Sequence, residues 1–203
     1  MKTIILTSLI STGLFVSACS SSSTTNVNST AAGNKATTNS APANAPETAK
    51  ADDVPASVKA AIPSAQTFTT QHKDLSDAQI TSIEKDTSSK VTEKDHHSYL
   101  AFSTASGPRT QVGAATVVKA AGKEFVIVYD NKDGSPVIKE VKAEGFPAGF
   151  LSQFAGKGHD NDLLLGVDIK ANGAKEDEAK SVTEAIRIDV LTMQALYGSA
   201  HSH

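Results

Sequence analysis

The residues whose types and spacing best fit a binding function form the run Asn172-Gly173-Ala174-Lys175, just before the last helical segment of the chain. A glycine-containing turn that opens a helix presents backbone N–H groups to an anion such as a phosphate. Lys175 adds a cation that can pair with such a group as a point charge. The run therefore predicts a turn at which the backbone approaches a ligand closely.

Three acidic residues directly after this turn favour a different interpretation. Glu176, Asp177 and Glu178 stand against the single cation of Lys175, which leaves a local charge of −2. Acidic side chains in the first turn of a helix interact favourably with the helix dipole, by about 0.3 to 1 kcal/mol each. In this interpretation the helix carries its own anions, and the turn is only a helix start.

The region that contains the turn, residues 146–197, resembles the FMN-binding domain family of flavin-bearing quinone-reductase subunits and exported electron-transfer lipoproteins. The shared layout is a Gly-rich turn at 156–158, an apolar run at 163–165, Asp168 ahead of the turn, and a long amphipathic segment. In that family an acidic residue leads into a Ser-Gly-Ala-Thr turn, and the FMN phosphate is esterified to the threonine.

The resemblance implies a role in extracytoplasmic electron transfer, with FMN as cofactor and other exported redox proteins as partners. Lys175 stands at the position of the threonine and has no hydroxyl group, so the implied FMN is held non-covalently. An alignment of this chain with the family pattern also needs one extra residue between the turn and Val182. The alternative is a flavin-free descendant of the fold that acts as a periplasmic binding or protein-interaction module. Both readings favour an electron-carrier or binding domain over a stand-alone enzyme.

The histidines are the other candidates for chemistry. His96 and His97 are neighbours at the start of an expected strand, so their side chains point to opposite faces and only one can join a given site. His159 lies beside Asp160 in a loop, and His201 and His203 end the chain. The spacing of these residues in the sequence does not indicate three or four metal ligands that converge on one point, so no metal is predicted. No catalytic residue is assigned either, since a Gly-x-Ser-x-Gly elbow and a free cysteine are lacking.

The N-terminus has the pattern of an export signal. Lys2 precedes an apolar run at 4–16, which is shorter than the ~20 residues of a membrane span and closes on Val16-Ser17-Ala18-Cys19. This ending resembles the bacterial lipobox, which predicts a signal peptide at 1–18 and acylation of Cys19, by chains such as palmitate, to hold the protein on membrane lipid. Ser20 is not the aspartate of an inner-membrane retention signal. An outer-membrane location facing the periplasm is favoured if the organism is Gram-negative.

The rest of the chain divides by composition. Residues 19–53 are rich in Ser, Thr, Asn, Ala and Pro, which predicts a disordered tether behind the lipidated cysteine. Residues 54–198 have the length of one domain, and 199–203 are expected to fray. The net charge of −3 argues against nucleic acid as a partner.

Hydrophobic periodicity predicts an α+β fold for the domain. Helices are expected at 55–62 and at 76–86, with an extended stretch between them and a capping box at Ser76. Alternating β-rich runs at 98–104, 110–119, 123–129 and 137–143 are separated by short Gly-containing turns, which favour antiparallel hairpins. The run at 123–129 is apolar on both faces, so the sheet should be covered on both sides there.

Two further helices are expected after the sheet. Residues 147–154 predict a short helix with its phenylalanines on one side. Val182, Ile186, Val190, Met193 and Tyr197 recur at three- or four-residue spacing, which predicts a helix of about 20 residues that ends at Gly198. The expected architecture is a twisted antiparallel sheet of four to five strands, with short N-terminal helices and a long C-terminal helix packed on it.

Overall fold

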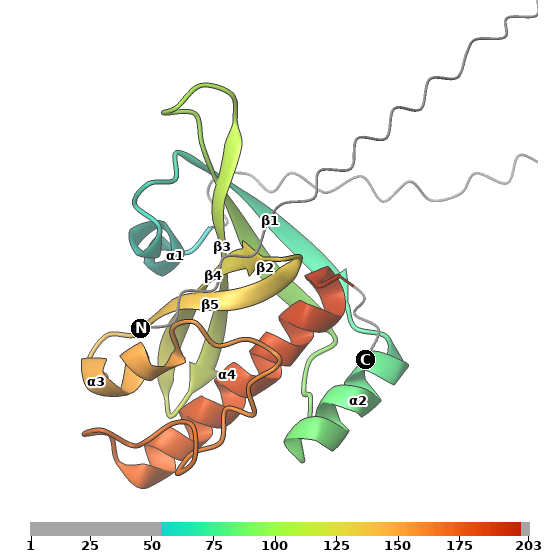
Figure 1. Ribbon diagram of the computed structural model, residues 1–203, viewed down its shortest axis with the longest axis vertical. Coiled ribbons are helices and arrows are strands. Elements are labelled where there is room, and N and C mark those ends of the chain that lie inside the picture. Colours follow the sequence, from blue (N-terminus) through green and yellow to red (C-terminus); the bar gives the residue numbers. More distant parts are fainter. Residues whose placement is uncertain (1–53, 200–203) are drawn as a thin grey trace, which may run out of the picture. The chain divides into compact units, whose positions relative to one another are not determined.

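The computed structural model describes residues 54–199, which form an α+β domain (Figure 1). The element order confirms the expected architecture. The helices are α1 (Ala56–Ala61), α2 (Asp77–Thr87), α3 (Ala148–Leu151), the 3-10 turn η2 (Ser152–Phe154) and α4 (Glu176–Tyr197). The strands are β1 (Thr67–Asp74), β2 (Asp95–Ser103), β3 (Thr110–Ala120), β4 (Lys123–Lys132) and β5 (Ser135–Lys142).

The five strands form one antiparallel sheet in the order β1-β2-β3-β4-β5, a meander in which each strand pairs with the next. The stretch that was expected only to be extended, between the first two helices, is the edge strand β1. Two-residue turns join β3 to β4 and β4 to β5, with positive φ at Ala121, Gly122, Asp133 and Gly134. Successive positive φ values match the right-handed twist of the strands, which is why such turns close tight hairpins.

Helix α4 covers one face of the sheet and encloses the larger core (Figure 1). Its stripe of Val182, Ile186, Val190 and Met193 is buried, as the periodicity predicts. Phe125, Ile127 and Tyr129 of β4 meet this stripe from the sheet side. A chain of edge-to-face aromatic contacts extends the same core through Phe125, Phe146, Phe150 and Phe154, with ring centroids 5.1 to 5.4 Å apart.

Helix α1 covers the opposite face of the sheet, a placement that its sequence did not reveal. Val58 is fully buried there, against Val126 and Val128 of β4. The alternate residues of β4 therefore face two separate cores, which confirms the expected cover on both sides. Val54, the first described residue, is already part of this second core at 5% exposure.

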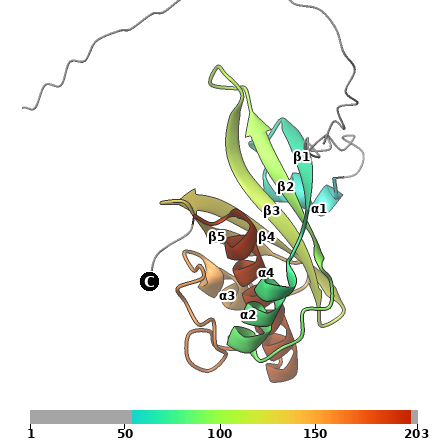
Figure 2. The same cartoon turned by 90° about the vertical axis from the view of Figure 1, so that its right-hand side faces the viewer.

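Helix α2 packs beside α4 rather than on the sheet (Figure 2). The predicted capping box is present, because Ser76 and Gln79 bond reciprocally through side chain and backbone. Gln79 also donates to the carbonyl of Ala195 at 2.7 Å, and Arg187 of α4 donates to the carbonyl of Asp86 at 2.7 Å. These contacts fix α2 along the outer side of α4 and place the start of β2 beside the same helix.

Candidate functional site

The turn at 172–175 lies directly before α4, as the sequence predicts. Asn172 and Gly173 have φ values of 39° and 90°, and the N–H of Ala174 donates to the carbonyl of Ala171 at 2.9 Å. The Asn172 side chain donates to the carbonyl of Gly149 at 3.3 Å, which fixes the turn against α3. Lys175 is the N-cap residue of α4 and provides no side-chain cap.

The side chain of Lys175 points into solvent beside an acid. It is 84% exposed, and its Nζ lies 3.3 Å from a carboxylate oxygen of Glu178. Glu176 and Asp177 occupy the rest of the first turn of α4. The cation that a phosphate would need thus already has a carboxylate partner, and the acids fit their expected role at the positive end of the helix. Binding of FMN at this turn stays a prediction.

The histidines divide as the strand geometry predicts. His96 faces α4, where its Nε2 lies 2.9 Å from Asp189, while His97 faces the other way and its Nε2 lies 2.6 Å from Asp95. His159 has its Nε2 3.1 Å from Asp160. His201 and His203 lie outside the described residues.

The predicted lipidation at Cys19, the signal peptide at 1–18 and the tether at 19–53 also lie outside the described residues. Within residues 54–199, no helix combines the length and hydropathy that a membrane crossing requires. Of the expected tail, Ser199 is described and donates its N–H to the carbonyl of Gly134 at 2.8 Å.

A buried carboxylate at the centre of the α4–sheet interface is the residue that the sequence reading missed. Asp189 is only 5% exposed, which is an unusual position for an acidic side chain. One of its oxygens lies 2.9 Å from Nε2 of His96, and the other accepts hydrogen bonds from Thr116 at 2.6 Å and Tyr129 at 2.7 Å. Burial of a carboxylate is costly unless donors surround it, and three strands supply them here.

The Asp189 cluster lies where the sheet separates into two branches. Strand β2 pairs with β1 along residues 95–102, but it pairs with β3 only from Tyr99 onward. The part of β3 from Thr116 onward pairs with β4 instead. The sheet therefore forks between β2 and β3, and Asp189 of α4 reaches His96 on one branch and Thr116 on the other.

A pocket of about 550 Å³ occupies the fork, and we call it the fork pocket. Its volume is within the range of small-molecule sites. Its walls combine apolar side chains with ionisable ones. The apolar set includes Leu75, Val91, Tyr99, Val117, Val118, Ala185 and Ile188, and the ionisable set is Lys90, Glu93, Asp95, His96, His97, Lys119, Glu124 and Asp189.

The imidazole of His96, which lines this pocket, has within residues 54–199 a hydrogen-bond partner at only one of its two ring nitrogens. Its Nε2 contacts Asp189, whereas its buried Nδ1 has no hydrogen-bond partner among the described residues. Buried polar atoms are nearly always paired in folded proteins, so an exception in a pocket wall is a candidate ligand contact. His96 lines the pocket, so a bound molecule that shifts the ring slightly can offer this nitrogen a partner while its apolar part contacts the pocket's aliphatic side chains.

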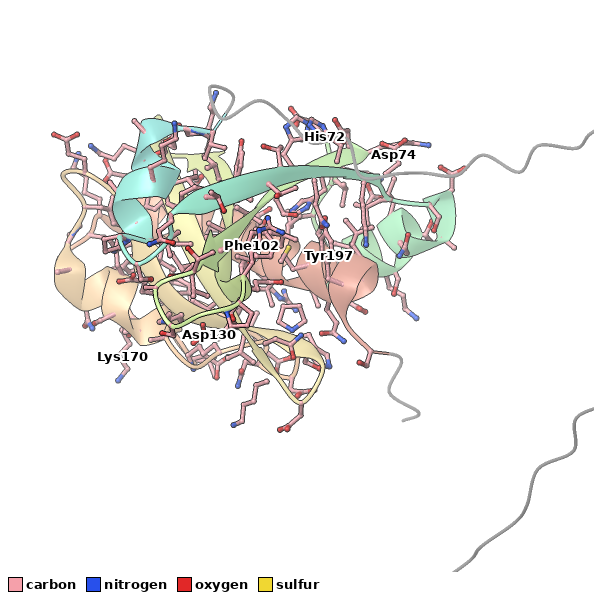
Figure 3. The ribbon with its side chains drawn as sticks, turned by 90° about the horizontal axis from the view of Figure 1, so that it is seen from above. His72, Asp74, Phe102, Asp130, Lys170 and Tyr197 are labelled. Atoms are coloured by element: carbon pink, nitrogen blue, oxygen red, sulfur yellow. The ribbon has the colours of Figure 1, made fainter. Side chains whose placement is uncertain are left out.

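The environment of the carboxylate also changes the ionisation of Tyr129. Burial, followed by the charge of Asp189, raises the pKa of Tyr129 well above its ordinary value. Tyr129 thus remains a neutral hydrogen-bond donor to Asp189. It also lines a second pocket of about 690 Å³, together with Tyr197. Figure 3 labels Tyr197, at the end of α4.

Tyr197 also lines that second pocket. Its hydroxyl lies 2.8 Å from Oγ of Ser98, and the ammonium of Lys73 lies 4.0 Å from its ring centroid. Burial is the main cause that raises the pKa of Tyr197. The Asp189 cluster thus lies between two pockets, since His96 and Asp189 line the first and Tyr129 lines the second.

One sequence signal pointed to Asp189. It lies three residues after Ile186 and four before Met193, inside the apolar stripe of the last helix. An acid at such a position requires buried donors on the facing element. Those donors come from strands far away in the chain, so the sequence could flag Asp189 but could not name its partners.

Comparison with protein-family models, with curated proteins and with solved structures gave no match. The resemblance to the FMN-binding domain family therefore stays a prediction that depends on residues 146–197.

Proposed function

We propose that the domain is a flavin-free binding module that takes a small amphipathic molecule in the fork pocket. The observation that carries this proposal is the His96–Asp189 pair in the pocket wall, with Nδ1 of His96 buried and unpartnered. Asp189 holds the imidazole at Nε2 and so fixes the ring in one orientation. Nδ1 can pair with either a donor or an acceptor of the ligand, because an imidazole nitrogen can take either role.

The aliphatic walls of the fork pocket define the other half of the ligand. Val117 and Ile188 line it from β3 and α4, and Leu75 lines it ahead of α2. Pockets of this size bind molecules that bury most of an apolar body and present a few polar groups. The proposed ligand therefore has a hydrophobic body and at least one hydrogen-bonding group, and no chemical conversion is assigned to it.

A fluorescent amphipathic probe tests this proposal directly. Anilinonaphthalene sulfonate should bind the purified chain from Val54 onward with about one site, and its fluorescence should rise. Ala185→Phe fills the pocket from α4 and should weaken probe binding by at least about tenfold. Ala105→Phe, the same substitution at an exposed turn, is the matched control. Equal probe binding by the wild type and both variants would sink the proposal.

A second candidate function is a redox carrier that holds FMN non-covalently. The observation in its favour is the start of α4, where Asn172 and Gly173 adopt positive φ and Lys175 adds no side-chain cap. This geometry leaves backbone N–H groups of the first turn to receive a phosphate. The role would be electron transfer with other exported redox proteins, as the family resemblance implies.

The two candidate functions predict different visible absorbance for the purified protein. A flavin carrier should show absorbance near 450 nm after addition of FMN and removal of the excess, whereas the flavin-free module should stay colourless. Covalent attachment is tested by Lys175→Thr with Asn172→Ser, which restores a Ser-Gly-Ala-Thr turn. Only weak flavinylation of that variant by a flavin transferase is expected, since Glu176 and Asp177 still repel the phosphate at about 1 kcal/mol per charge at 4 Å in water. Intact mass measures the adduct.

The proposed location is a membrane surface outside the cytoplasm. The signal pattern and lipobox-like ending at Cys19 support an exported lipoprotein, and Ser20 favours the outer membrane with the domain facing the periplasm in a Gram-negative cell. A long Ser/Thr/Asn-rich tether would then let the binding domain sample the space above the lipid.

A further inference from the structure

A second group of side chains lies at one end of the antiparallel β1–β2 strand pair, on the face of the sheet opposite to α4. His72 of β1 is directly opposite His97 of β2 in the strand register. Their ring centroids are 4.1 Å apart. Asp95, two residues before His97 on the same face, lies with Oδ2 3.6 Å from Nδ1 of His72 and 2.6 Å from Nε2 of His97.

The next pair in the register adds another acid. Asp74 is directly opposite Asp95, and it shares a face with His72 because side chains alternate along a strand. Like charges directly opposite each other destabilise a strand pair. Figure 3 labels His72 and Asp74 near the end of β1. The β1–β2 strand pair thus presents two imidazoles and two carboxylates as adjacent cross-strand pairs, an arrangement that a cation would stabilise.

We propose that His72, Asp95 and His97 bind a divalent transition-metal ion of the Zn²⁺ and Cu²⁺ class, with Asp74 as the candidate fourth ligand. One ligand atom from each of the three first residues lies within 4.8 Å of the others. Two atoms bound to one such ion lie at most about 4.4 Å apart, given bond lengths of about 2.0 to 2.2 Å. Shifts of a few tenths of an ångström therefore suffice, and all three side chains are about half exposed and free to adjust.

The ligand set determines which ions fit. Two imidazole nitrogens with carboxylate oxygens suit Zn²⁺, Cu²⁺ and Ni²⁺, whereas Mg²⁺ and Ca²⁺ prefer oxygen ligands alone. Asp95 and His97 also line the fork pocket, so a metal held by them lies at its rim. The metal ligands are nevertheless different residues from the pair proposed to hold the amphipathic ligand, because His96 and Asp189 face the other side of the sheet.

Titration calorimetry with Zn²⁺ on the full chain in detergent tests the proposal. One ion per chain is expected at this site, and His72→Ala, His97→Ala and Asp95→Asn should each weaken its affinity by at least about tenfold. Asp95→Asn keeps the side-chain shape, so it reports ligation even where an alanine variant disturbs the pairing of β1 with β2. Thermal midpoints without metal confirm that each variant is folded.

Two histidines outside the proposed site provide a control for zinc binding by other imidazoles. His201→Ala with His203→Ala removes two imidazoles that lie outside the described residues, and this variant should bind Zn²⁺ within about twofold of the wild type. With Cu²⁺ as probe, electron paramagnetic resonance should show two nitrogen ligands in the wild type and one in His72→Ala. The proposal is overturned if the wild type binds no Zn²⁺, if the tail variant loses the ion, or if the three site variants bind it unchanged.

Discussion

Asp189 connects one helix to three strands through a single carboxylate. His96 comes from β2, Thr116 from β3 and Tyr129 from β4. Loss of one donor leaves a buried charge with fewer hydrogen bonds, which costs more than loss of a neutral pair. The cluster therefore holds α4 in register on the sheet and keeps the fork pocket's wall in place.

The raised pKa of Tyr129 predicts a loss of stability at alkaline pH. The unfolded chain releases the tyrosine proton near its ordinary pKa of about 10, whereas the folded chain retains it, so this contribution is complete below pH ~10 and declines as pH rises toward the folded pKa. The slope is up to about 1.4 kcal/mol per pH unit. Tyr129→Phe should flatten this alkaline limb in denaturant titrations between pH 9 and 11.

Thr116→Val is the matched control for that experiment. It removes another donor from the same oxygen of Asp189 without removing a titrating group. It should lower stability by about 1.5 to 3 kcal/mol at every pH and keep the wild-type alkaline slope. If Tyr129→Phe and Thr116→Val gave the same slope, Tyr129 would not be the group responsible.

At the scale of elements, α4 determines how the larger core closes. Ile186 is fully buried against the sheet, so Ile186→Ala should lower the free energy of unfolding by about 2 to 4 kcal/mol through lost contacts and a cavity. Ile188→Ala, the same change two residues later at a partly exposed position, should cost clearly less. A change below about 0.5 kcal/mol for Ile186→Ala in urea unfolding would contradict the packing described.

The sequence predicted local structure well because local signals produce it. The capping box at Ser76, the tight turn at Asp133-Gly134 and the stripe from Val182 to Met193 each depend on residues only a few positions apart. The alternation in β4 even predicted two covered faces. Each of these elements is present at nearly the expected bounds.

The arrangement of the fork and its cluster could not be predicted in this way. The separation of β2 from β3 before Tyr99 depends on which strand each branch pairs with, and the donors to Asp189 lie 60 to 93 residues away in the chain. The pairing of His72 with His97 likewise depends on the register of β1, whose sequence indicated only an extended stretch. Non-local contacts of this kind leave no periodicity in the sequence.

At the scale of the whole molecule, the two proposed sites share one end of the sheet. The Asp189 cluster lies at the fork on the α4 side, and the same part of β2 carries Asp95 and His97 on the other side. Helix α1 covers that second face farther along the strands, where Tyr99 and Ala101 are buried. The histidine and aspartate side chains beyond it are therefore left open to solvent.

The predicted anchor gives the last test, at the level of the cell. Cys19→Ser should release the protein from the membrane fraction, because acylation at Cys19 is the expected attachment and residues 54–199 contain no helix able to span a bilayer. The signal at 1–18 should then stay uncleaved or the protein should be missorted. Ser22→Ala, a substitution three residues later, should stay membrane-bound like the wild type. Fractionation and intact mass decide the question, and a Cys19→Ser protein found in membranes as fully as the wild type would show that another part of the chain anchors it.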